Sequence, residues 1–170
     1  DDPDFHNWTF GADNDWYDQL LRTAAITNHS LNINGGSEKA VYAVGVSYLY
    51  QDGIMDVDNN YKRMNFRGSV DYDATNWLKV GFNGVFSNST QQVPNNQAWQ
   101  KAFNCPPIVA LYDDKYNVKS FPDKFGSPDA IGYTSNFYNP VATAKYFDSS
   151  KENYQVLSNF YAQIDFIPSK

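Results

Sequence analysis

Apolar and polar residues alternate with a period of two in four long stretches of the chain. From Tyr42 to Tyr50 every second residue is large and apolar or aromatic, whereas Ala43, Gly45 and Ser47 between them are small. Because successive side chains of a β-strand point to opposite faces, this pattern predicts strands with one apolar and one polar face. Each stretch has about ten residues or more, which suits a tilted membrane-crossing strand and exceeds the average strand of about 5–6 residues.

The remaining sequence predicts how the strands connect. Asp13 and Asn14 can cap a short helix over about 16–22. Tight turns are expected at 35–38 and 74–76, and longer connections at 53–60 and 92–152. We therefore predict an all-β fold, an antiparallel up-and-down meander of long strands that forms part of a transmembrane β-barrel, with a long aromatic-rich outer loop and a short N-terminal helix. The predicted strands are residues 26–34, 40–52, 61–73, 77–91 and 153–167.

Aromatic residues support the membrane interpretation and also mark the long loop. Those near strand ends resemble interfacial girdles, namely Tyr42, Tyr48, Tyr50, Tyr61, Tyr72 and Trp77. In the loop, which has a short predicted helix at 97–103, aromatic rings could stack on a sugar; packing within the loop or against a partner protein is the favoured interpretation. The candidate ligand or partner contacts are Trp99, Phe103, Tyr112, Tyr116, Tyr133 and Tyr138.

Composition excludes several classes of function. The 170 residues carry a net charge of −6 with no basic patch, which argues against nucleic-acid binding. No apolar run reaches the about 18 residues of a transmembrane helix, a criterion that does not bear on barrels. The acidic opening, Asp1 to Asp4, is not a signal peptide and is expected of a mature or internal segment. Cys105 is the single cysteine, so it has no partner for an internal disulfide.

No pattern indicates catalysis or a cofactor. Asp56, Asp58 and Asn60 imitate the start of a calcium loop, but Tyr61 and Arg67 stand where glycine and glutamate are needed. The two histidines lie in separate elements without metal-ligand spacing, and nucleophile and phosphate-loop motifs are absent. We predict that the chain is not an enzyme and holds no metal or cofactor.

The polar residues of the long strands should share one face. They could form cross-strand pairs and contact a plug inside the barrel, or they could line a path for a polar substrate; the first interpretation is favoured. The set comprises Arg63, Asn65, Arg67, Asp71, Asn83, Gln155, Asn159, Gln163 and Asp165.

Short motifs in a fixed order resemble the SusC/RagA family of TonB-dependent outer-membrane transporters. Each motif is weak alone, but together they extend from residue 15 to residue 168. The matching elements are Asp15-Trp16-Tyr17-Asp18-Gln19-Leu20 with Arg22-Thr23-Ala24, Asn28-His29-Ser30-Leu31, Gly35-Gly36-Ser37-Glu38-Lys39, Tyr48-Leu49 with Gln51-Asp52-Gly53-Ile54, Tyr61-Lys62-Arg63, Trp77-Leu78-Lys79-Val80-Gly81, Asn139-Pro140-Val141-Ala142 and Asn159-Phe160-Tyr161-Ala162 with Phe166-Ile167-Pro168.

The resemblance implies that the chain is an internal piece of a barrel of about 22 strands, without the plug, the TonB-contacting motif or the closing strand. It implies import of glycans or peptides across the outer membrane of a Gram-negative bacterium of the Bacteroidetes. A SusD-like surface lipoprotein would capture substrate, and TonB would act through the missing N-terminal part. Two alternatives stay open: a complete small outer-membrane barrel, and a soluble β-sheet module that binds carbohydrate.

Overall fold

The computed structural model describes residues 12–113, 125–127 and 139–166, which fall into two compact units. The sheet unit comprises residues 24–52, 60–92 and 150–166. The helical unit comprises the described residues of 12–23, 53–59 and 93–149. In the described part of the chain, no helix has both the length and the apolar character needed to cross a membrane.

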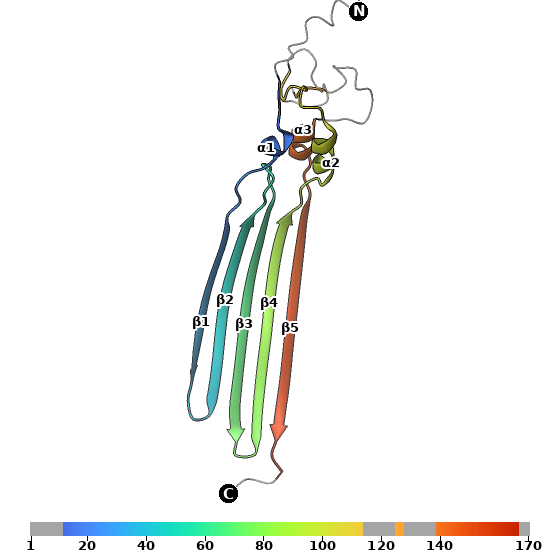
Figure 1. Ribbon diagram of the computed structural model, residues 1–170. Helices are drawn as coiled ribbons and strands as arrows, with labels where there is room; N and C mark the ends of the chain where they lie inside the picture. The colour runs from blue at the N-terminus through green and yellow to red at the C-terminus, as the bar shows by residue number, and fades with distance from the viewer. Residues whose placement is uncertain (1–11, 114–124, 128–138, 167–170) are drawn as a thin grey trace, which may run out of the picture. The chain divides into compact units, whose positions relative to one another are not determined.

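The sheet unit is one five-stranded antiparallel sheet in which chain order and spatial order agree (Figure 1). The predicted up-and-down meander is therefore confirmed. The strands are longer than the expected ones at several ends, and the last begins and ends three residues earlier than expected. Their bounds are β1 Ile26–Gly36, β2 Ala40–Asp52, β3 Asn60–Thr75, β4 Leu78–Gln92 and β5 Ser150–Ile164.

The register sorts the side chains into the two predicted faces. Phe66 of β3 lies opposite Val46 of β2 and Phe86 of β4, so apolar rows run across the sheet. The next residue, Arg67, lies opposite Gly45 and Val85 on the other face. Most large side chains of the apolar face are exposed, and Phe160 of β5 reaches 75%. This face therefore offers a broad apolar surface that extends across all five strands.

Two glycines of the polar face make room for long side chains from neighbouring strands. A Cβ atom at Gly45 would lie 2.5 Å from Nε of Arg67 and 2.6 Å from Oδ1 of Asn32. The absence of a side chain on β2 therefore lets Arg67 on β3 reach Asn32 on β1. In the same way, the ring of Tyr161 lies over Gly81, where a Cβ atom would overlap it.

Both hairpin turns of the sheet lie at the same end (Figure 1). Residues 37–39 connect β1 to β2, and the amide of Ser37 donates to the carbonyl of Ala40 at 2.7 Å. Residues 76–77 connect β3 to β4 beside a register shift between Asp73 and Thr75. The longer connections leave from the other end of the strands, as the sequence predicted.

The helical unit contains three short helices in its described residues: α1 Trp16–Leu20, α2 Gln97–Asn104 and α3 Pro140–Lys145. α1 begins after Asp15, whose carboxylate accepts from the amides of Tyr17 and Asp18, and α2 matches its predicted position. We did not predict α3. The described residues of the segment expected as a long loop at 92–152 hold α2, α3 and the start of β5. The core comprises Trp16, Leu20, Met55, Ala98, Ala102, Cys105, Val109 and Ala144.

Candidate ligand and partner surface

The helix α2 presents a continuous exposed face on the helical unit. Ala98 and Ala102 are buried in the core, whereas Gln97, Gln100 and Asn104 are exposed. Phe103 lies among these amides and is 78% exposed. At 3.6 residues per turn, the four exposed residues occupy one arc of about 120°. The outward face of α2 therefore carries three amides and one exposed aromatic ring, and Lys101 borders it about 40° around the axis from Gln97.

Trp99 borders this face, one turn before Phe103. Its side chain is half-buried and packs against the core of the helical unit. Its ring centroid lies 6.0 Å from that of Tyr17 in α1. The structure thus brings two of the predicted contact residues, Trp99 and Phe103, together on one helix side.

Tyr112 belongs to a second aromatic cluster of the same unit. Its ring stacks on Phe125 at a centroid distance of 5.1 Å and stays 58% exposed, while Phe125 is completely buried. Tyr146 meets Phe125 edge-on at 6.0 Å. The other predicted contacts, Tyr116, Tyr133 and Tyr138, lie outside the described residues.

Asn139 holds this second cluster to α3. Its side chain is fully buried, and Nδ2 donates to the carbonyls of Leu111 at 3.1 Å and Gly126 at 3.2 Å. Its Oδ1 accepts from the amides of Val141 and Ala142, which makes Asn139 the N-cap of α3. The sequence signal for this helix start was asparagine directly before proline.

The polar face of the sheet makes cross-strand hydrogen bonds. Asn65 donates to Ser47 at 3.0 Å, and Nη2 of Arg67 donates to Asn32 at 2.5 Å. The Tyr161 hydroxyl also donates to Asp71 across β4. These contacts agree with the interpretation that the polar residues pair across strands. The structure places all but one of the predicted polar set on this face; Asp165 follows the end of β5.

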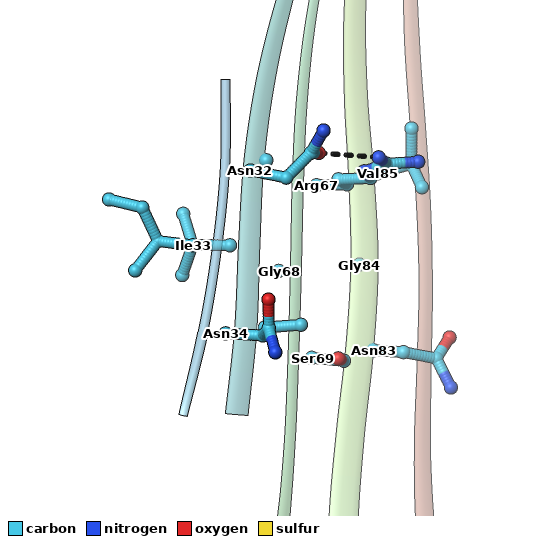
Figure 2. Close-up of a pocket in the computed structure, with 12 residues that line it drawn as sticks. Asn32, Ile33, Asn34, Arg67, Gly68, Ser69, Asn83, Gly84 and Val85 are labelled. Atoms are coloured by element: carbon cyan, nitrogen blue, oxygen red, sulfur yellow. Dashed lines mark hydrogen bonds between the residues drawn. The ribbon is translucent and has the colours of Figure 1, made fainter. Parts of the chain in front are cut away.

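A shallow groove of about 310 Å³ crosses the middle of β1 to β4 (Figure 2). Its lining includes two neighbouring rows of the polar face, Asn32, Gly45, Arg67 and Val85 in one and Asn34, Ala43, Ser69 and Asn83 in the other. Figure 2 also shows Asn32 bonded to Arg67 beside it. The groove therefore belongs to the polar face of the sheet, since none of the flanking apolar-face side chains lines it, namely Phe66, Val70, Phe82 and Phe86.

The acidic residues near 56–60 are not arranged as a calcium loop. Asp56 forms an ion pair with Arg22 at 3.7 Å, and β3 already begins at Asn60. Within residues 12–113, 125–127 and 139–166, no three histidine, cysteine or acidic side chains come together as a metal site requires.

Cys105 gives a testable prediction about the helical unit. Its side chain is 5% exposed, and burial raises the pKa of the thiol from 9.0 to about 12. Between about pH 9 and 12 the thiol therefore loses its proton when the protein unfolds. The stability that comes from burying the neutral thiol is fully present below pH 9 and is lost as the pH rises towards 12. We expect slow maleimide labelling at pH 8 until denaturant is added, and a weaker alkaline loss of stability in Cys105→Ala. Rapid labelling of the folded protein would contradict the burial.

Comparison with protein-family models gives no match. The chain is similar to curated proteins named TonB-dependent receptors. It is 29% identical over 168 residues to TonB-dependent receptor P3 of Formosa agariphila, covering 92% of this chain and 16% of that protein. TonB-dependent receptor P26 of the same organism is 29% identical over 157 residues, covering 92% of this chain and 15% of that protein. TonB-dependent receptor SusC of Bacteroides thetaiotaomicron is 33% identical over 135 residues, with coverages of 76% and 13%.

The antiparallel meander of long strands and the similarity to these receptors define the class of protein. The chain is a segment of a TonB-dependent receptor. Its similarity to SusC makes it a segment of the SusC-like kind. The chain spans only about one sixth of the length of the curated relatives it matches.

Proposed function

We propose that the chain forms part of the wall of a transmembrane β-barrel that imports nutrients across the outer membrane of a bacterium of the Bacteroidetes. The observation that carries this proposal is an uncharged band on the apolar face of β3. Its alternate residues run from Met64 to Ala74, a length of about 33 Å at about 3.3 Å per residue. A strand tilt of about 40° turns this length into a band about 25 Å tall, which is the height of the apolar band of outer-membrane barrels. The residues are Met64, Phe66, Gly68, Val70, Tyr72 and Ala74.

Aromatic residues at both ends of this band support the same proposal. Tyr48 and Tyr154 lie in one cross-strand row towards the long connections, and Tyr42 and Tyr72 lie nearer the hairpin turns. Interfacial girdles of outer-membrane barrels have such positions. Tyr61, which we had counted with them, shares the face of Arg63 and does not belong to this set.

The substrate and partners of the whole protein follow from the family resemblance. We infer that glycans or other oligomeric nutrients are imported together with a SusD-like lipoprotein, and that TonB acts through a part of the receptor outside this chain. The support is the similarity to SusC and the exposed aromatic and amide face of α2. A role in binding and passage requires no catalytic group.

The size and location of the native polypeptide test this proposal. In fractionated cells, an antibody against residues 93–113 should detect a band far above 19.3 kDa in the outer membrane. Intact cells should also bind this antibody, because long connections of such barrels face outward. An outer-membrane band near 19 kDa would favour a complete small barrel. A soluble band of that size would leave the carbohydrate-binding module.

A further inference from the structure

We propose that two hydrogen bonds on the polar face act as clamps that curve this part of the barrel wall, with the polar face on the inside of the curve. The Arg67 clamp joins β3 to β1 across β2, and the Tyr161 clamp joins β5 to β3 across β4. This inference rests on the proposed function, because a wall whose polar face is concave belongs to a barrel with a polar interior. It adds the residues that set the curvature.

The Arg67 clamp passes over a glycine on the strand that it crosses. Asn32, Gly45 and Arg67 lie opposite one another on β1, β2 and β3, and Nη2 of Arg67 donates to Oδ1 of Asn32 (Figure 2). A Cβ atom at Gly45 would lie 2.6 Å from this acceptor oxygen and 2.5 Å from Nε of Arg67. A side chain at position 45 would therefore obstruct the clamp.

The Tyr161 clamp repeats this arrangement on the next pair of strands. Asp71, Gly81 and Tyr161 lie opposite one another on β3, β4 and β5, and the Tyr161 hydroxyl donates to Oδ1 of Asp71. A Cβ atom at Gly81 would lie 2.6 Å from this oxygen and would overlap the Tyr161 ring. The same combination of donor, glycine and acceptor therefore occurs twice, and β3 belongs to both clamps.

The glycines in the middle of the apolar face have different surroundings. Gly68 and Gly84 lie opposite each other on β3 and β4. A Cβ atom at Gly68 would meet no atom of another strand within 4 Å, and the atoms nearest to one at Gly84 belong to Phe82 of the same strand. Neither of these glycines carries a clamp, so the two clamps act on the polar face.

A clamp on one face of a sheet favours curvature towards that face. Neighbouring strands lie about 4.8 Å apart, so alternate strands lie about 9.6 Å apart. In a curved sheet the side chains of alternate strands converge on the concave face and diverge on the convex face. A hydrogen bond between alternate strands therefore holds the clamped face concave. Glycines are also used to introduce curvature into designed sheets.

Distances between spin labels on β1 and β5 of the whole receptor in lipid vesicles test the clamps. One pair of labels replaces Leu31 and Val156, which lie in one row of the apolar face. The other pair replaces Ser30 and Gln155 in the neighbouring row of the polar face. Each pair spans about 19 Å, because four strand spacings of about 4.8 Å separate the labels. Cys105 and any other cysteine of the receptor are replaced by alanine.

We expect the double variant Arg67→Met with Tyr161→Phe to flatten the sheet, because both hydrogen bonds are lost while most of the side-chain bulk remains. The apolar-face distance should shorten and the polar-face distance should lengthen, each by about 1–2 Å of a span of about 19 Å. Tyr161→Phe alone removes one hydroxyl and should give shifts of the same signs and smaller size, which keeps the test decisive if the double variant does not assemble.

A hydrogen bond between neighbouring strands provides the matched control. Asn65 donates to Ser47 at 3.0 Å between β3 and β2 and crosses no third strand. Asn65→Ala should therefore leave the distance in the apolar-face pair unchanged. Equal shifts in Asn65→Ala and in the clamp variants would overturn the inference, and so would unchanged distances in the clamp variants or shifts of the same sign in both label pairs.

Outer-membrane assembly is measured for the same receptors, and it separates this inference from the proposed function. A clamp variant that assembles normally with unchanged label distances rejects the clamps alone. Absence of the wild-type receptor from the outer membrane rejects the proposed function.

Discussion

Replacing Val70 with arginine is expected to cost about 2–4 kcal/mol of folding free energy in a lipid bilayer, the range for a cation at the midplane of an outer-membrane barrel. Val70 lies near the middle of the uncharged band and is 41% exposed on the apolar face of β3. Tyr42 and Phe82 lie opposite it, so the new charge would be surrounded by apolar side chains and lipid. Since about 1.4 kcal/mol corresponds to a factor of ten, the ratio of folded to unfolded receptor should fall by about 30-fold to 700-fold.

The neighbouring residue supplies a matched control. Ser69 is also exposed, but it faces the polar side, opposite Ala43 and Asn83. Ser69→Arg adds the same charge one residue away and should change stability by about 0.5 kcal/mol or less. Denaturant titrations of the whole receptor in lipid vesicles measure both variants. Equal effects, or a tolerated Val70→Arg, would contradict a lipid-facing position for this side of the sheet.

The sheet was predictable because its signal is local. Apolar and polar residues alternate with a period of two along the strands. A register slip by one residue would exchange the two faces along a whole strand. The strand ends were less predictable. Gly35 and Gly36 suggested an early end to β1, yet both residues still pair with β2. Likewise β5 begins at Ser150, because pairing with Gln92 extends it into residues without apolar alternation.

The helical unit was less predictable because its contacts are distant in sequence. Trp16 donates to Pro106 across 90 residues, and Leu21 pairs with Met55 in an isolated bridge. No periodic pattern in the sequence predicts such contacts. The sequence positions of the loop aromatic residues did not separate exposed Phe103 from buried Phe125. The exposed and buried sides of α2 can be assigned only when Ala98 and Ala102 are known to pack inward.

Replacing Asn139 with alanine is expected to destabilise the helical unit by about 3 kcal/mol, since a lost N-cap costs about 0.5–2 kcal/mol and each buried group without a partner about 1–3 kcal/mol. The side chain is fully buried and bonds to two carbonyls and two amides. Asn139→Asp keeps the acceptor that caps α3 but loses the donor to Leu111 and Gly126, so it should also be strongly destabilising.

An exposed cap provides the comparison for this prediction. Asp15 accepts two amide hydrogen bonds at the start of α1 and is exposed, so water can replace its carboxylate. Asp15→Ala should therefore cost only about 1 kcal/mol. Hydrogen exchange of the amides in α3 and residues 111–113 of the whole receptor measures the local opening free energy. If the local opening free energy falls no more in Asn139→Ala than in Asp15→Ala, burial of the cap adds nothing to the stability of the helical unit. The expected larger loss would mean that one buried amide joins α3 to the cluster of Tyr112 and Phe125, and thereby sets the position of an exposed aromatic ring on the helical unit.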